Sequence, residues 1–446
     1  MQKYLIKSIQ AVTAERIFTT DVLVAGERIE RIDAHINEVN AQVIDGAGKY
    51  LFPGVIDDQV HFREPGLTHK ATIYSESKAA VAGGVTSFME MPNTQPPAFT
   101  QDLLEEKYAR AAQTSLANYS FYMGTSNDNL NEVLRTNEKK DRVCGVKIFM
   151  GASTGNLLVD NYVTLDHIFS GSHLLIATHC EEESIIKSNY ERIKAQHPNI
   201  EPALHPEIRN TEACYESSFK AVQLAKKHNS RLHILHITTA DELGLFTNLL
   251  PLSEKRITSE VCVHHLHFTA NDYATHGNNI KCNPAIKAAH HKTALWEALL
   301  DDRLDVVATD HAPHLPSEKS DVYEKAHAGL PLVQHPLQLM LYYHQQGKIS
   351  LQKIVQKMST DVATCFRIKG RGRIEEGFFA DLVIVDLAQA TTVAKSNIYY
   401  HCGWSPLEGV TLPATITHTF VSGHLAYKHG VFNENKRGLR LNFETN

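Results

Sequence analysis

The sequence predicts an α/β fold: a (β/α)8 TIM-like barrel with a small β-sandwich domain formed by the N- and C-terminal segments. Three observations predict it. Short apolar runs of strand length alternate with helical patterns through the middle of the chain. Both ends of the chain instead alternate apolar and polar residues, which is typical of antiparallel sheet. No glycine-rich phosphate loop follows the first apolar run, so a barrel is favoured over a doubly wound sheet.

Residues 1–52 and 369–446 are assigned to the sandwich, because their strand-like runs alternate in the same way. Gly26 interrupts one of these runs, which predicts a turn or a bulge there. The runs are Tyr4–Val12, Asp21–Ile32, Asp381–Asp386 and Thr415–Val421.

Residues 53–368 are assigned to the barrel, because they contain eight apolar runs separated by helical patterns. The predicted strands are Val55–Phe62, Val85–Met91, Ala117–Met123, Val143–Met150, Leu174–His179, Leu232–Ile237, Ile257–Val263 and Val306–Asp310. The clearest helices are Gln101–Thr114, Glu212–His228 and Lys292–Leu300, and a longer helical stretch covers Leu332–Phe366.

The composition indicates a cytoplasmic enzyme. The net charge of −6 is spread along the chain without a basic stripe, which argues against a nucleic-acid partner. No apolar stretch is long enough to cross a membrane, and the N-terminus does not resemble a signal peptide. The seven cysteines are scattered and form no CxxC pair, as expected in a reducing compartment.

Polar side chains follow the predicted barrel strands at their C-terminal ends, where such barrels place their active sites. Three histidines and an aspartate at the ends of four strands are poorly explained as separate hydrogen-bonded side chains, and they suit Zn²⁺. The histidine pairs at 264–265 and 290–291 lie in looser contexts, and we expect them in solvated loops. The strand-end residues are Gln59, His61, Arg63, Asn93, Lys147, His179, His236 and Asp310, with His314 shortly after.

Several motifs together resemble the dihydroorotase family of metal-dependent cyclic amidohydrolases. ATDHAPH at Ala308–His314 is shared with related enzymes such as allantoinases, whereas the REPG box containing Arg63 is more discriminating, together with Asn93. The resemblance covers nearly the whole chain. The other motifs are DxxVHFREPG at Asp57–Gly66, MPNT at Met91–Thr94, GVKIFMG at Gly145–Gly151 and CGWSPLEG at Cys402–Gly409.

The resemblance implies a role for each matching position. Lys147 matches a carboxylated lysine that bridges two metals, and Asp310 matches a metal ligand that is also the catalytic base. The resemblance therefore implies one or two Zn²⁺ ions per chain and a small-molecule substrate, dihydroorotate or N-carbamoyl-L-aspartate. The implied metal ligands are Gln59, His61, Lys147, His179, His236 and Asp310, and the implied substrate-binding residues are His61, Arg63, Asn93, Asn283, His314, Ala328 and Gly329.

The chain departs from the family pattern at Gln59. The first strand of the family usually carries Asp-x-His-x-His, and Gln59 stands at the first histidine position. A glutamine carbonyl is a weaker Zn²⁺ ligand than imidazole, so we expect the metal position that it serves to be less fully occupied.

Alternatives to dihydroorotase therefore stay open. One is another cyclic amidohydrolase, acting on allantoin or a hydantoin, and the other is a catalytically inactive homologue with a structural or regulatory role. A homodimer is implied by the resemblance alone.

Overall fold

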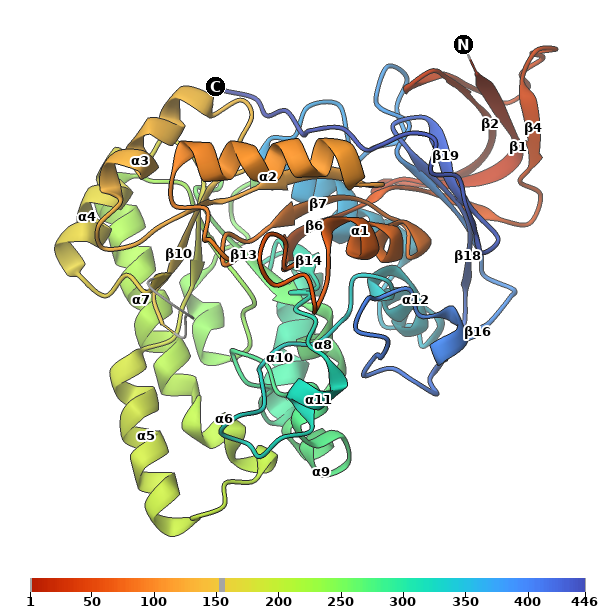
Figure 1. Cartoon of the computed structure of the whole chain (residues 1–446). Helices are drawn as coiled ribbons and strands as arrows, with labels where there is room; N and C mark the ends of the chain where they lie inside the picture. Colours follow the sequence, from red (N-terminus) through yellow and green to blue (C-terminus); the bar gives the residue numbers. More distant parts are fainter. Residues whose placement is uncertain (1, 152–156, 446) are drawn as a thin grey trace.

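The computed structural model describes residues 2–151 and 157–445 of the chain. A barrel of parallel strands forms its centre, helices surround it, and a β-rich domain lies at one side (Figure 1). The barrel strands are β6 (Val55–Val60), β7 (Val85–Glu90), β8 (Asn118–Phe121), β9 (Met123–Gly124), β10 (Val146–Phe149), β11 (Ile176–His179), β12 (Leu232–Ile234), β13 (Ile257–Cys262) and β14 (Val306–Ala308).

The strands pair in parallel in chain order, as a (β/α)8 barrel requires. One sheet runs β6-β7-β8 and the other β14-β13-β12-β11-β10-β9. The predicted third strand is divided into β8 and β9, which are separated by the buried Tyr122. The first and last strands meet where Val60 bridges to His311, and the His61 N–H donates to the His311 carbonyl at 2.7 Å.

The helices around the barrel follow the predicted pattern. The predicted helix Gln101–Thr114 is confirmed with the same bounds as α2, and the Thr100 side chain caps it by accepting from the Leu103 N–H. The stretch 332–366 is divided into three α-helices with a short π-helical turn before the last. The helices are α1 (Ile73–Ala82), α2, α3 (Leu130–Arg135), α4 (Tyr162–Gly171), α5 (Glu183–Gln196), α6 (His205–Ile208), α7 (Thr211–His228), α8 (Val263–His267), α9 (Tyr273–His276), α10 (Ala289–Leu300), α11 (Pro316–Lys319), α12 (Pro336–Gln345), α13 (Leu351–Val355) and α14 (Asp361–Phe366).

The two ends of the chain form one nine-stranded sheet. They meet where β5 pairs antiparallel with β15, with Leu51 opposite Ile384. Gly26, at φ 61°, makes the turn between β2 and β3, so the predicted run Asp21–Ile32 is a hairpin. The strands are β1 (Lys3–Val12), β2 (Ile17–Ala25), β3 (Arg28–Asp33), β4 (Gln42–Asp45), β5 (Tyr50–Pro53), β15 (Leu382–Asp386), β18 (Thr415–Val421), β19 (His424–Lys428) and β20 (Val431–Phe432), and β16 (Thr391–Thr392) pairs with β17 (Thr411–Leu412) outside this sheet.

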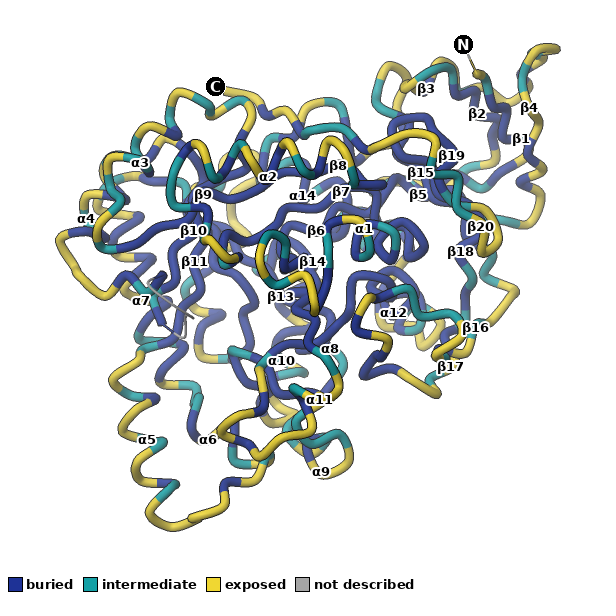
Figure 2. The backbone as a smooth tube through the Cα atoms, in the orientation of Figure 1, coloured by how far each residue is buried: buried dark blue, intermediate teal, exposed yellow. Residues whose placement is uncertain are grey.

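The predicted fold class, a (β/α)8 barrel with a β-rich domain built from both chain ends, is confirmed. The domain boundaries at residues 52/53 and 368/369 stay a prediction. Figure 2 shows the barrel strands buried along their length, whereas exposed residues lie on the outer helices. Among the described residues, no helix is long and apolar enough to span a membrane. All seven cysteines are free and buried.

The expectation that two histidine pairs lie in solvated loops is wrong for His264, His265 and His291, which are buried, and only His290 is exposed; all four residues lie in helices. His264 and His265 belong to α8, and they are only 1% and 3% exposed. His290 and His291 lie in the first turn of α10, where His291 is buried and its Nδ1 accepts from the Ala240 N–H at 3.0 Å. A single helical turn directly after a strand is too short to give a periodic signal, which explains the error at α8.

Candidate metal centre and active site

One cavity of about 180 Å³ opens at the C-terminal ends of the barrel strands. Every residue that the sequence singled out for the site lines it. Phe149, Ala312 and His327 line it too, and the sequence had not indicated them. The predicted lining residues are Gln59, His61, Arg63, Asn93, Lys147, His179, His236, Asn283, Asp310, His314, Ala328 and Gly329.

The first and last strands bring His61 and Asp310 together. The Nε2 atom of His61 lies 3.0 Å from Oδ1 of Asp310, and Nδ1 of His61 lies 2.7 Å from Oδ1 of Asn93. Burial alone would raise the pKa of Asp310, but the hydrogen bond and charge of His61 hold it below its usual value. Asp310 is therefore an ionised carboxylate near neutral pH, as a metal ligand or a general base must be.

The backbone is strained at three of the predicted site residues. Arg63, His236 and Asp310 have φ values of 68°, 41° and 45°, in the left-handed region that residues other than glycine rarely adopt. Such strain persists where the surrounding structure holds a side chain in a required direction, and it concentrates at functional sites. Arg63 lies beyond the end of β6 at Val60, so this backbone turn, and not strand alternation, aims it into the cavity.

Lys147, on β10, lines the cavity together with the candidate ligands. Its side chain is buried, and its Nζ atom has no hydrogen-bond partner among the described residues. Burial lowers the pKa of Lys147 to about 7. A neutral amine is the form that reacts with carbon dioxide, so this environment suits the carboxylated lysine that the family resemblance implies.

His179 and His236 form the second group, at the ends of β11 and β12. The Nδ1 atom of His179 lies 2.9 Å from Nε2 of His236. The Nε2 atom of His179 faces Oε2 of Glu181 at 3.0 Å, and Arg209 binds the same carboxylate. Burial alone would raise the pKa of Glu181, but Arg209 and His179 together lower it to about 2. A charged carboxylate behind a histidine fixes the tautomer of a metal ligand, and the sequence had not indicated Glu181.

These residues fit a metal centre. The Nδ1 atom of His179 and Nε2 of His236 lie 2.9 Å apart, and Nδ1 of His236 and Nζ of Lys147 are buried without partners in the described parts of the chain. Leaving such groups unpaired costs about 1–3 kcal/mol each, which a bound cation would offset. The charge of Lys147 acts on His179, His236 and Asp310, so it lies near both groups.

Gln59 presents its nitrogen, and not its oxygen, to Asp310. The Nε2 atom donates to Oδ1 of Asp310 at 3.1 Å, and Oε1 lies 3.9 Å from Sγ of Cys262 on β13. The sequence predicts that the side-chain carbonyl of Gln59 binds a metal. In the structure this carbonyl is directed toward Cys262.

Arg63 is a buried cation on the side of the cavity formed by the loop after β14. Its Nε atom donates to the Pro313 carbonyl at 3.2 Å, and Nη2 lies 3.0 Å from Nε2 of His314. Burial lowers the pKa of Arg63 to about 10, which leaves it charged near neutral pH. Arg63 makes no ion pair within the part of the chain that the structure describes. A buried guanidinium without a protein carboxylate suits an anionic ligand.

Lys70, which the sequence had not indicated, supports the same wall. Its Nζ atom lies 3.1 Å from Nδ1 of His314 and 2.9 Å from Oε1 of Glu318. The Nε2 atom of His314 lies 3.1 Å from the Ala328 carbonyl and 3.0 Å from Nη2 of Arg63. The carbonyl requires a donor at Nε2 and the guanidinium requires an acceptor there, so these contacts fix no single tautomer of His314. Gly329 follows at φ 142°, and a Cβ atom there would lie 2.5 Å from the Ala312 carbonyl, so only glycine lets this loop reach the cavity.

A second buried cluster lies next to the candidate centre. The Nε2 atom of His233 lies 3.2 Å from Oδ2 of Asp58 and 3.4 Å from Oε2 of Glu260. The other oxygen of Glu260 accepts from the His236 N–H at 3.0 Å, which connects the cluster to the backbone of a candidate ligand. We interpret the cluster as a support for the strained backbone at His236. No sequence pattern indicated this cluster, because its members lie inside strands β6, β12 and β13.

Comparisons with known proteins agree with this arrangement. The model of the amidohydrolase family matches residues 50–426. A dihydroorotase of Pyrococcus furiosus is 32% identical over 416 residues, which cover 92% of this chain and 91% of that protein. A dihydroorotase of Carboxydothermus hydrogenoformans is 32% identical over 435 residues, covering 95% of this chain and 98% of that protein.

Solved structures of related enzymes have the same fold. An L-hydantoinase (dihydropyrimidinase) from Arthrobacter aurescens superposes with a TM-score of 0.91 at 27% identity, covering 97% of this chain and 98% of that chain. A D-hydantoinase (dihydropyrimidinase) from Thermus sp. superposes with a TM-score of 0.86 at 24% identity, covering 98% of each chain, and supports the fold alone. The chain therefore belongs to the amidohydrolase family and is a dihydroorotase-like member of it.

Proposed function

We propose that the protein is a dihydroorotase, which reversibly hydrolyses the cyclic amide of (S)-dihydroorotate to N-carbamoyl-L-aspartate in de novo pyrimidine (UMP) synthesis. The observation that carries the proposal is Arg63, a buried guanidinium that forms no ion pair with any described residue and that lines the same cavity as the candidate metal ligands. Dihydroorotate combines a cyclic amide with a ring carboxylate. An enzyme that acts on it therefore needs a metal centre for the amide and a cationic side chain for the carboxylate. The dihydroorotase relatives at 32% identity support the same reading.

We propose His61, Lys147, His179, His236 and Asp310 as ligands of one or two Zn²⁺ ions, with Lys147 carboxylated. Histidine and carboxylate ligands suit Zn²⁺, and the partnerless Nζ of Lys147 supports the carbamate. A Zn²⁺ centre, when bound, supplies a water of lowered pKa and polarises the amide carbonyl. We assign Gln59 to hold Asp310, because its nitrogen and not its oxygen faces that carboxylate.

The remaining roles follow from the side chains themselves. Arg63 offers a planar fork to the ring carboxylate, and His314 lies beside it with Nε2 3.0 Å from Nη2 of Arg63. Asn93 and Asn283 meet the polar ring atoms without adding charge, and Oδ1 of Asn283 has no partner among the described residues. Asp310 accepts a proton from the attacking water and gives it to the ring nitrogen as the C–N bond breaks. The main chain at Ala328 and Gly329 borders the ring.

A second candidate is a hydantoinase-type enzyme. The likeness to the L-hydantoinase (dihydropyrimidinase), with its TM-score of 0.91, favours it. Hydantoins and dihydropyrimidines lack the ring carboxylate, so that function would leave Arg63 without a ligand. Allantoin lacks it as well. An inactive homologue has no use for buried ligands, and the other five ligand positions are filled by His61, Lys147, His179, His236 and Asp310.

The test is an assay of the purified protein in both directions. We expect ring opening of dihydroorotate at alkaline pH, ring closure of N-carbamoyl-L-aspartate at mildly acidic pH, and loss of both after chelation. Restoration by Zn²⁺ is the control. Faster opening of allantoin or a hydantoin would favour the second candidate, and the absence of all turnover would favour the inactive homologue. A homodimer in the cytoplasm stays a further expectation, from the resemblance and the cysteine pattern.

A further inference from the structure

Cys262, His264 and His265 form a compact cluster that the proposed reaction does not use. One ligand atom of each side chain lies within 4.8 Å of those of the other two. The three residues are 0%, 1% and 3% exposed, and the centroids of the two imidazole rings are 4.1 Å apart. A thiol and two imidazoles are the ligand types that Zn²⁺ prefers.

The histidines of the cluster have buried nitrogens without partners. Neither ring nitrogen of His264 has a hydrogen-bond partner among the described residues, and Nδ1 of His265 has none either. His264 therefore offers a ring nitrogen that no described residue uses. Leaving buried polar atoms unpaired is unfavourable, and a bound cation would satisfy them.

The tautomer of His265 is fixed in a way that suits a metal ligand. Its Nε2–H donates to the Pro284 carbonyl at 3.1 Å, which leaves the lone pair on Nδ1. A main-chain carbonyl behind one ring nitrogen commonly orients a histidine whose other nitrogen binds a metal. The partnerless atom is therefore the one that can ligate.

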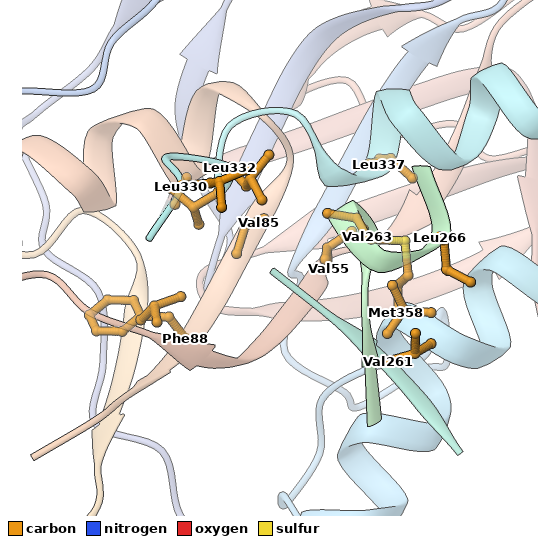
Figure 3. Packing of buried hydrophobic residues seen from close by; sticks show 14 of the residues in the cluster. Val55, Val85, Phe88, Val261, Val263, Leu266, Leu330, Leu332, Leu337 and Met358 are labelled. Carbon is orange, nitrogen blue, oxygen red and sulfur yellow. The ribbon is translucent and has the colours of Figure 1, made fainter. Parts of the chain in front are cut away.

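The short helix α8 holds these side chains on the inside of the structure. Val263 and Leu266 are three residues apart on α8 and pack into the apolar core beside Met358 (Figure 3). Because that face of α8 is fixed in the core, the rings of His264 and His265 are held on a different face, close to Cys262 at the end of β13. The cluster is thus built on rigid elements.

Gln59 supplies a fourth donor from the opposite strand. The Cys262 thiol faces Oε1 of Gln59 at 3.9 Å and Oε1 of Glu260 at 3.6 Å as a hydrogen-bond donor. Loss of the thiol proton when an ion enters leaves Sγ and Oε1 of Gln59 available to bind one Zn²⁺ ion. The amide cannot rotate freely, because Nε2 donates to Asp310. The carbonyl is therefore directed toward the cluster by a hydrogen bond on its other side.

We propose that Cys262, His264 and His265, with the carbonyl oxygen of Gln59, bind a Zn²⁺ ion that is distinct from the catalytic centre. Cys262 binds as the thiolate and releases its proton to solvent when the ion enters. The ion fixes Gln59, and through the Gln59 amide it positions Asp310. This explains how the chain uses a glutamine where a histidine ligand is expected.

The experiment uses the full chain loaded with Co²⁺ in place of Zn²⁺. A thiolate ligand gives Co²⁺ a charge-transfer absorption in the near ultraviolet, which imidazole and carboxylate ligands do not. We expect this band in the wild type and in Cys144→Ser, a control at another buried cysteine, and its loss in Cys262→Ser. We also expect Cys262→Ser to retain one metal ion per chain fewer than the control. A wild type without the band, or a band that survives in Cys262→Ser, would overturn the proposal.

A second measurement covers the case in which Cys262→Ser does not fold. X-ray absorption at the zinc edge of the wild type, loaded with Zn²⁺ alone, is expected to show a sulfur ligand at about 2.3 Å. A spectrum with nitrogen and oxygen ligands only would overturn the proposal. Neither readout depends on turnover, so failure to hydrolyse dihydroorotate would count against the proposed function and not against this site.

Discussion

The side-chain amide of Gln59 donates a hydrogen bond to Oδ1 of Asp310 at 3.1 Å, and so connects the first barrel strand to the loop after the last. His61 meets the same oxygen at 3.0 Å. Asp310 is thus held by two neighbours before any metal or substrate binds. The position where the family usually carries a histidine thus contributes a hydrogen-bond donor to the carboxylate that we propose as the catalytic base.

Gln59→His is expected to strengthen metal binding in the catalytic cavity. An imidazole adds a Zn²⁺ ligand where the wild type offers an N–H to Asp310. The substitution is best made in Cys262→Ser, so that only ions in the catalytic cavity are counted. After dialysis, the double variant should retain more metal than Cys262→Ser alone, approaching two ions per chain. No gain in metal would mean that the catalytic centre is already complete without a ligand at this position.

Arg63→Lys is expected to weaken substrate binding while metal content stays unchanged. The charge is preserved, but lysine cannot make the two parallel hydrogen bonds of a guanidinium to a carboxylate. A loss of about 2 kcal/mol corresponds to roughly a 30-fold fall in kcat/KM for dihydroorotate, mostly through KM. Arg110→Lys, at an arginine paired with Glu106 on the exposed face of α2, is the control. An unchanged KM would show that Arg63 does not bind the substrate carboxylate.

Asp310→Asn is expected to lower kcat by about 10²–10⁴-fold, because the amide cannot accept the proton of the attacking water. A neutral side chain also binds Zn²⁺ less strongly, so the metal content of the variant must be measured and restored before the assay. If the fully loaded variant turns over at the wild-type rate, Asp310 is a ligand or positioning group and another residue is the base.

The metal-free protein is expected to gain stability as the pH rises from about 7 toward 10. The pKa of Lys147 is lowered from 10.5 to about 7 by burial in the folded state. In this window the unfolded chain therefore binds a proton at Lys147 that the folded chain does not. The free energy of unfolding rises by up to about 1.4 kcal/mol per pH unit, whereas below pH 7 the cost of the buried charge is fully present.

Lys147→Met removes this contribution, so its stability should depend less steeply on pH than that of the wild type. Urea denaturation of both proteins, with chelator and without carbon dioxide, measures the two slopes. The substitution also changes packing, and this shifts the free energy of unfolding by the same amount at every pH. Comparing the slopes, and not the absolute free energies, removes that shift. Equal slopes would show that Lys147 is charged in the folded protein at pH 8–10.

The barrel could be predicted because each strand carries its own signal. A buried apolar run ending in a polar side chain marks both a strand and its functional end, as at His179 and Asp310. The ligands come from strands far apart in the sequence, yet barrel topology alone brings their ends to one face. The sequence therefore predicts which residues line the cavity, among them His61, Lys147 and His236.

What could not be predicted depends on side-chain direction. The sequence places Gln59 next to the ligands, but only the fold shows that its nitrogen faces Asp310 and its oxygen faces Cys262. Glu181 follows His179 by two residues, and its role behind that ring depends on Arg209 from another segment. The pair His264–His265 lacks periodicity, and its burial follows from the packing of α8 in the core.

The most direct test of dihydroorotase function compares two substrates that differ only in the carboxylate that Arg63 is proposed to bind. Dihydrouracil has the ring of dihydroorotate without this group. For the Zn²⁺-loaded wild type, kcat/KM for dihydroorotate is expected to exceed that for dihydrouracil by at least about 100-fold, because a buried guanidinium without its anion is costly. Arg63→Lys should reduce this ratio. Equal or faster opening of dihydrouracil, or no opening of either ring by the loaded protein, would contradict the proposed function.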